Sequence, residues 1–112
     1  MGVEEWAERY ARAWEEADDD AVAALFTEDA TYYTAPFRKP WTGRQAIVDS
    51  WLKRKDEQGG WQFRYEVIAV AGRLGFVRGW TVYPDVRYSN LWVIRLADGG
   101  RSEEFTEWWM KE

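Results

Sequence analysis

The sequence predicts an α+β fold in which three helices pack on one face of an antiparallel sheet. Two observations support this prediction. Near the N-terminus, apolar residues recur every three or four positions, which is the period of a helix with one buried face. From residue 61 onward, apolar and polar residues alternate, which is the period of a strand. Helices followed by a run of strands are typical of a two-layer α+β domain.

Three helices are expected in the first half of the chain. The first has a single apolar stripe, made of Val3, Trp6, Tyr10, Ala13, Trp14 and Ala17. The three acids at 18–20 can cap a shorter helix over residues 21–26. Three adjacent acids also suit a metal, but a helix cap in a solvated turn explains them better. Thr42-Gly43-Arg44-Gln45 has the spacing of a capping box, so a third helix is expected to begin there and to end at Gly59-Gly60.

Five strands are expected. Aromatic and β-branched residues indicate a short strand over residues 30–34. Alternation then indicates four longer strands, over residues 61–69, 76–83, 88–96 and 102–110. Turn residues at 72–73, 84–85 and 97–100 join them as an antiparallel meander. No linker or repeat divides the chain, so residues 1–112 are expected to form a single domain.

Composition excludes several classes of function. The chain has 15 basic and 20 acidic residues, a net charge of −5, and no extended basic stripe of the kind that nucleic-acid-binding proteins carry. It has no Cys and no His, which excludes disulfides, thiol catalysis and histidine-based metal sites. The acidic N-terminus is unlike a signal peptide, and no apolar run is long enough to span a membrane. We therefore expect a cytoplasmic protein without nucleic-acid or membrane partners.

Three motifs resemble the nuclear transport factor 2-like superfamily, and most of all its SnoaL-like branch. They are Ala24-Leu25-Phe26-Thr27-Glu28-Asp29-Ala30, Pro36-Phe37 and Gly43-Arg44-Gln45-Ala46-Ile47. The resemblance covers nearly the whole chain. It implies a cystatin-like cone, a roll of three N-terminal helices packed on a curved, mainly antiparallel sheet. It does not imply one activity, because this fold hosts isomerases, cyclases, epoxide hydrolases, dehydratases and non-enzymes.

The ketosteroid isomerases of this superfamily carry three polar groups that can be sought in the chain. These are a Tyr on the first helix, a general-base Asp just before the Pro-Phe pair, and a protonated Asp on the penultimate strand. Tyr10 matches the first, but the two acid positions hold Ala35 and Trp92. The base and half of the oxyanion hole are therefore missing, and ketosteroid isomerase activity is not expected.

Epoxide hydrolases of this fold use an Asp-Arg-Asp set around an attacking water. Arg64 or Arg78 can supply the guanidinium, and the acids on the strands are Glu66, Glu104 and Glu107. Nothing in the sequence brings two of these acids to one cavity. Epoxide hydrolysis stays an open alternative.

The SnoaL-like polyketide cyclases place an acid on the last strand, seven residues after a turn glycine. Counting from Gly100 reaches Glu107. In those enzymes the carboxylate removes a proton from a carbon flanked by carbonyls and needs no cofactor, so the resemblance implies Glu107 as the base and no cofactor here. Burial in an apolar cavity would raise the pKa of Glu107 and suit it to proton transfer. A one-residue bulge would turn it to the other face.

Strand alternation and the fold analogy together give the candidate site. The expected catalytic residues are Glu107 and Tyr10. The expected ligand-binding residues lie on the concave face or at its mouth: Asn90, Trp92, Trp109, Phe105, Tyr33, Trp41, Phe37 and Arg64. A buried carboxylate needs a partner, and the candidates for Glu107 are Arg64, Arg78, Asn90 and Tyr10.

Two functions are consistent with these residues. The first is a domain that binds a small hydrophobic or aromatic molecule, with cofactor-free acid/base chemistry of the cyclase or isomerase type centred on Glu107. The second is a non-catalytic binding or dimerisation module whose cavity is filled by aromatic residues such as Trp92 and Trp109. A cavity of roughly 300 Å³ or more, faced by Glu107, favours the first.

The opposite face of the sheet also needs a partner. Strand alternation places on it Arg78, Trp80, Trp108 and Met110. An exposed apolar patch of this kind usually marks an interface. We expect a homodimer that forms through the sheet.

Overall fold

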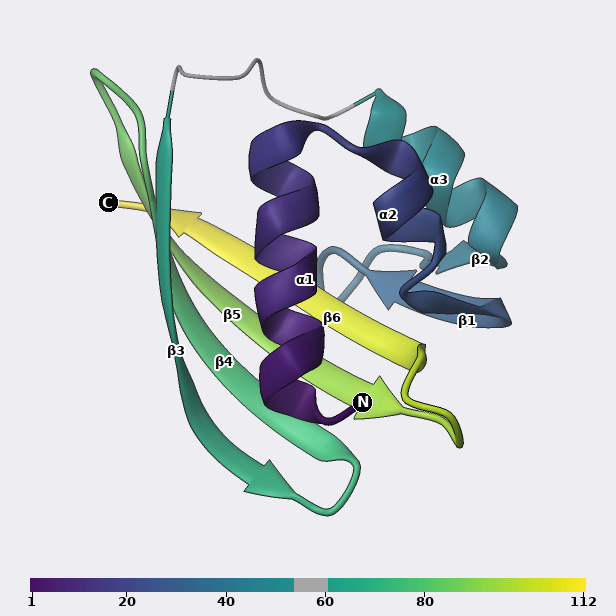
Figure 1. Ribbon diagram of the computed structural model, residues 1–112. Helices are drawn as coiled ribbons and strands as arrows, with labels where there is room; N and C mark the ends of the chain where they lie inside the picture. The colour runs from purple at the N-terminus through teal and green to yellow at the C-terminus, as the bar shows by residue number, and fades with distance from the viewer. Residues whose placement is uncertain (54–60) are drawn as a thin grey trace.

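The computed structural model describes residues 1–53 and 61–112, in which three helices pack on the concave face of one curved sheet (Figure 1). The sheet has six strands in the order β2-β1-β6-β5-β4-β3. The helices are α1 (Val3–Glu16), α2 (Asp19–Ala23) and α3 (Arg44–Leu52). The strands are β1 (Phe26–Tyr33), β2 (Trp41–Thr42), β3 (Gln62–Ala71), β4 (Leu74–Val82), β5 (Arg87–Leu96) and β6 (Ser102–Lys111). The predicted α+β class is confirmed.

Helix α1 lies across the concave face and buries the predicted stripe. Trp6 and Tyr10 have no exposed surface, and the Trp6 indole donates to the Leu25 carbonyl at 2.8 Å. On the solvent side, Glu5 pairs with Arg9 and Glu8 with Arg12 over one helical turn. These exposed pairs add only a few tenths of a kcal/mol each, roughly 0.2–0.5. Burial of the aromatic stripe therefore fixes the helix on the sheet.

The second helix is shorter than predicted. Asp18 caps it as expected, accepting from the Ala21 amide at 3.1 Å. The helix ends at Ala23, however, and Phe26 already belongs to β1. The chain leaves the helix early because the Leu25 carbonyl pairs with the Ser102 amide at 2.8 Å, which draws this segment to β6.

The predicted capping box of the third helix does not form. The N-cap of α3 is Gly43, at φ 92°, and no side chain caps the helix. Thr42 is instead paired with Thr31 in the β2–β1 ladder, so its position is set by the sheet. The predicted end of this helix, at residues 59–60, lies outside the described residues.

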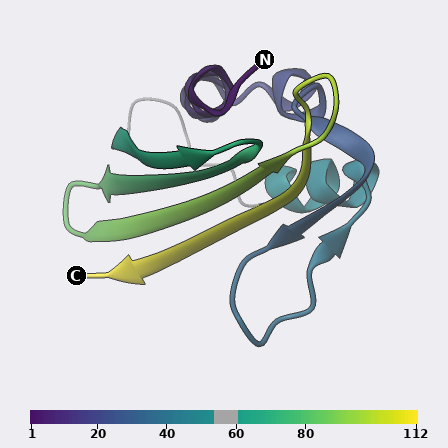
Figure 2. The same cartoon turned by 90° about the horizontal axis from the view of Figure 1, so that it is seen from below.

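The four long strands form the predicted meander, each within two residues of its expected bounds at either end. Strand β1 differs from them, since it pairs in parallel with β6 and shifts register between Phe26 and Thr31. Figure 2 shows the helices on one side of the sheet, and no described helix covers the convex side. The concave side of β6 thus faces α1 and α3 across an aromatic core.

Helix α1 packs very closely against β4 where Val3 meets Gly75. A Cβ atom added at Gly75 would stand 2.2 Å from Val3 Cγ1 and 2.8 Å from Val3 Cγ2. Nothing larger than glycine fits there while the helix keeps its place.

We therefore predict that Gly75→Ala lowers the free energy of unfolding by about 1–3 kcal/mol, the usual cost of overpacking, as measured by urea denaturation. Val3→Ala in the same chain should recover part of the loss, because it removes the clashing methyl groups. Gly2→Ala is the control, since nothing lies within 4 Å of an added Cβ at that position. An unchanged midpoint for Gly75→Ala would contradict the prediction.

Candidate functional site

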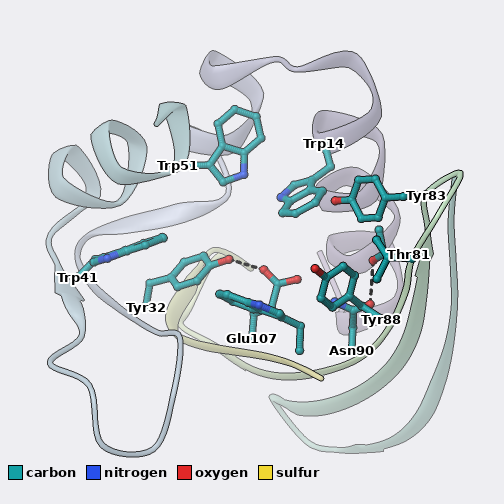
Figure 3. Close-up of a pocket in the computed structure, with 11 residues that line it drawn as sticks. Trp14, Tyr32, Trp41, Trp51, Thr81, Tyr83, Tyr88, Asn90 and Glu107 are labelled. Atoms are coloured by element: carbon teal, nitrogen blue, oxygen red, sulfur yellow. Dashed lines mark hydrogen bonds between the residues drawn. The ribbon is translucent and has the colours of Figure 1, made fainter. Parts of the chain in front are cut away.

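A cavity of about 430 Å³ lies between the concave face and the helices. Its walls come from nearly every element, as Figure 3 shows. The lining residues are Trp14, Tyr32, Trp41, Trp51, Thr81, Tyr83, Val86, Tyr88, Asn90, Glu107 and Trp109. Most are aromatic, and Glu107 is the one acid among them. The volume of the cavity falls in the ordinary range for a small-molecule site, roughly 300–1,000 Å³.

Glu107 is buried, with 3% of its surface exposed, and both of its oxygens accept hydrogen bonds. The Tyr32 hydroxyl donates to Oε1 at 2.7 Å. The Trp92 indole donates to Oε2 at 2.8 Å. Hydrogen bonds to both oxygens stabilise the ionised form of the carboxyl group, whereas burial disfavours it. These donors come from β1 and β5, the two strands that flank β6.

Tyr10 continues this network beneath the cavity floor. Its hydroxyl lies 2.8 Å from that of Tyr32. Burial, and then the negative charge of Glu107, raise the pKa of both phenols well above the ordinary 10.0. Both are therefore protonated at neutral pH. Since the Tyr32 hydrogen is directed at Glu107, the Tyr10 hydroxyl donates to Tyr32, and a chain of donors runs from α1 to the carboxylate.

Two indole groups lie near the Tyr10 hydroxyl, at the α1 end of the hydrogen-bond network. The buried Nε1 atoms of Trp14 and Trp51 have no hydrogen-bond partner in the part of the chain that the structure describes. Both approach the Tyr10 hydroxyl closely enough to lower its pKa, against the larger effect of burial. Neither indole completes a hydrogen bond to Tyr10, so the described donor chain begins at the Tyr10 hydroxyl.

Asn90 is the second polar group of the cavity, beside Glu107 on the concave face. It is 8% exposed, and its Oδ1 accepts from the Thr81 hydroxyl at 2.8 Å. That bond orients the amide. Its NH₂ group has no hydrogen-bond partner in residues 1–53 and 61–112, and it is available to a molecule in the cavity.

Four of the predicted site residues line the cavity, namely Glu107, Asn90, Trp109 and Trp41. Three others lie in the core beneath it, namely Tyr10, Trp92 and Phe105. Of these, Trp92 and Tyr10 reach the site through hydrogen bonds, and Phe105 reaches it only through packing against their rings.

The remaining three do not lie along the cavity. Tyr33 belongs to the opposite face of β1. Its neighbour Tyr32 takes the inward position and is buried, as is Ala30 two residues earlier. Phe37 is fully exposed in the loop after β1. Arg64 is exposed on β3 and borders a separate depression with Trp61.

Sequence reasoning missed seven lining residues: Trp14, Tyr32, Trp51, Thr81, Tyr83, Val86 and Tyr88. Alternation from Asn90 could have identified Tyr88, two residues earlier on the same face. Alternation from Ala30 could have identified Tyr32. Trp14 belongs to the predicted apolar stripe of the first helix, and nothing in the helical period distinguishes a core ring from one that also borders a cavity.

The described residues lack two further features. Within residues 1–53 and 61–112, no helix has the length and apolar character needed to cross a membrane. In the same ranges, no three His, Cys, Asp or Glu side chains cluster in a way that could hold a metal ion.

The curved sheet, the helices on its concave face and the aromatic cavity between them define a protein of the nuclear transport factor 2-like class. Comparison with family models identifies the branch, since residues 7–106 match the SnoaL-like domain. The chain belongs to this family.

Solved structures share the fold at low sequence identity. An NTF-2 like protein of unknown function from Burkholderia xenovorans has a TM-score of 0.81 and 15% identity, over 97% of this chain and 83% of that one. A steroid delta-isomerase from Pseudomonas aeruginosa has a TM-score of 0.73 and 17% identity, over 94% of this chain and 77% of that one. An LEH-like epoxide hydrolase from M. tuberculosis has a TM-score of 0.65 and 18% identity, over 95% of this chain and 80% of that one. No curated protein matches the sequence.

We predict that Tyr32→Phe destabilises the fold by about 2 kcal/mol, since a hydrogen bond to a charged group contributes roughly 1.5–3 kcal/mol. Chemical denaturation of the two proteins measures the difference. Tyr33→Phe is the matched control, because it removes a hydroxyl from the adjacent residue on the opposite face and should change stability by less than about 0.5 kcal/mol. Equal effects of the two substitutions would show that the bond to Glu107 contributes nothing.

Proposed function

We propose that this domain binds a small, largely hydrophobic molecule in the concave cavity, and that Glu107 transfers a proton to or from it without a cofactor. The observation that carries the proposal is a buried carboxylate, fixed by two donors, that faces an aromatic cavity of about 430 Å³. Neither Trp92 nor Trp109 fills that space, since Trp92 is packed in the core and Trp109 forms a wall. Such convergence of a polar group with an apolar pocket is the usual form of a ligand site.

The geometry supports the role of a base. Tyr32 and Trp92 favour the carboxylate form of Glu107, which can take a proton from a carbon next to a ligand carbonyl. Asn90 pairs with Trp109 across the sheet, so it lies diagonally from Glu107 on the same face. Its NH₂ group can donate to the carbonyl oxygen, where the negative charge develops as the proton leaves. Return of the proton to a different carbon of the enolate completes an isomerisation. Alternatively, the enolate carbon attacks a second carbonyl of the same molecule, and the oxygen of that carbonyl takes the proton from Glu107.

A second candidate function is a non-catalytic binding module. The observation that favours it is that both oxygens of Glu107 already accept hydrogen bonds from the protein. A carboxylate satisfied in this way also serves to tie β1, β5 and β6 together.

A ligand screen separates these functions. We predict that small aromatic carbonyl compounds raise the melting temperature of the wild type, and that Glu107→Gln abolishes proton exchange at the carbon next to the carbonyl while the compounds still bind. Deuterium incorporation followed by NMR measures the exchange. Glu104→Gln, on the same strand and the opposite face, is the control and should exchange normally. Binding without exchange in the wild type would support the non-catalytic module.

We also propose that the convex face packs against a second copy of the chain. Trp108 and Met110 are 38% and 69% exposed there, and they pair across the sheet with Leu91 and Ser89. Arg78 lies over the Trp80 ring, 5.1 Å from its centroid, and extends this surface onto β4. A patch of this kind suits a symmetric contact, in which the same face serves both copies.

Sedimentation velocity tests this contact. We predict that the wild type sediments as a dimer at micromolar concentration and that Met110→Glu shifts it to the monomer, because a buried charge at the contact is costly. Lys111→Glu is the matched control, since it adds negative charge at the neighbouring position on the concave side of β6. A monomeric wild type would rule out the proposed contact.

A further inference from the structure

Two tryptophan side chains bring hydrogen-bond donors without a described acceptor to the wall of the cavity. Trp14 comes from α1 and Trp51 from α3, and both line the space. Their Nε1 atoms are buried and have no hydrogen-bond partner in residues 1–53 and 61–112, and Trp51 as a whole is 2% exposed. A buried N–H group without a partner is costly, so a buried indole normally has one. These two donors therefore need an acceptor that the described chain does not supply.

The two donors lie close to one point. Burial raises the pKa of the Tyr10 hydroxyl, and both indoles lie near enough to that hydroxyl to oppose the rise. Figure 3 shows the two nitrogen atoms on the ring edges that face each other, above the hydrogen bond between Tyr32 and Glu107. Because the rings come from different helices, the packing of α1 and α3 on the sheet sets the spacing of the donors. A single acceptor atom between them can receive both hydrogens.

Tyr10 is the acceptor that the protein places near these donors, and it does not satisfy them. Its hydroxyl lies 2.8 Å from that of Tyr32, and neither indole completes a hydrogen bond to it. Tyr10 also belongs to the core beneath the cavity, whereas the two tryptophans border the cavity itself. The space that both indoles share is thus the space that a ligand would enter.

From these observations we propose that Trp14 and Trp51 together bind one carbonyl oxygen of the ligand. A carbonyl oxygen has two lone pairs, so it can accept both indole hydrogens. Asn90 offers its NH₂ group from β5, which gives the cavity a second and separate donor. A ligand with a single carbonyl is expected to use the indole pair, since two donors act on one oxygen there. A ligand that also reaches Asn90 carries a second acceptor oxygen.

NMR spectra of the ¹⁵N-labelled wild type test the contact directly. The probes are acetophenone and α-methylstyrene, which have matched shapes; in the second, a CH₂ group replaces the carbonyl oxygen. We expect acetophenone to move the indole N–H signals of Trp14 and Trp51 downfield, because each hydrogen becomes bonded to the oxygen. α-Methylstyrene brings the same ring without an acceptor and should not cause this shift. Triple-resonance experiments assign the signals.

Two variants test the energetic contribution of the pair. In Trp14→Phe and in Trp51→Phe, acetophenone should lose about fivefold more affinity than α-methylstyrene, because each variant removes one hydrogen bond to the oxygen. Comparing the probes cancels the effect of the smaller ring. Trp61→Phe is the matched control, since it removes a third buried indole N–H without a described partner. Trp61 packs edge-on against Trp14, at 5.5 Å between ring centroids, but borders a separate depression, so the ratio of the two affinities should not change.

The outcomes separate this inference from the proposed function, on which it rests only in treating the cavity as a ligand site. If both probes bind but acetophenone moves neither indole signal, the donor pair is wrong and the hydrophobic ligand site stands. The same conclusion follows if the ratio of affinities is unchanged in both folded variants. If neither probe binds to folded wild type at millimolar concentration, both proposals are wrong. Should a variant fail to fold, the wild-type spectra alone decide.

Discussion

A carboxylate removed from water has to recover its lost hydration from fixed donors, and much of this fold is arranged around that requirement. Glu107 lies on the concave face of the sheet, on β6, and only 3% of its surface is exposed to solvent. The strands on either side each supply one donor, Tyr32 from β1 and Trp92 from β5. Leaving either oxygen without a donor would cost several kcal/mol, roughly 2–7 for a buried polar group. The positions of β1, β5 and β6 are therefore coupled through one side chain.

The donor network also explains why a cavity persists in a core so rich in large rings. Tyr10, Tyr32 and Trp92 approach Glu107 from one side, and their rings pack against Phe105 beneath it. The other side of the carboxylate faces the space between α1, α3 and the ends of β4 and β5. The rings that border this space come from α1, α3, the strands β1, β2, β5 and β6, and the connection between β4 and β5. The result is an apolar site with a fixed charge in its wall.

Sequence reasoning recovered the parts of this site that depend on strand period. The count from Gly100, strand alternation and the fold analogy placed Glu107, Trp109 and Asn90 on the concave face. In the structure all three line the cavity, and Asn90 pairs with Trp109. It failed at Tyr33, because alternation places Tyr32 and Tyr33 on opposite faces but does not say which face is concave; the parallel pairing of β1 with β6 decides that. It failed at Phe37 because a loop has no period from which to infer orientation. It also named Arg64, Arg78, Asn90 and Tyr10 as candidate partners of Glu107, whereas the described hydrogen bonds come from Tyr32 and Trp92.

The bond between Tyr32 and Glu107 joins residues that are 75 positions apart in the chain. Contacts of such long range form only after the chain has lost the entropy of closing the loop between them. The meander from β3 to β6 can assemble through short hairpins, but β1 can join it only when β6 is in place. Trp92 can donate to Glu107 once the β5–β6 hairpin has formed, whereas the bond from Tyr32 also needs β1 to be in place. A partly folded chain would expose this acid to water, where it is an ordinary surface group, so the special chemistry of the site exists only in the completed fold.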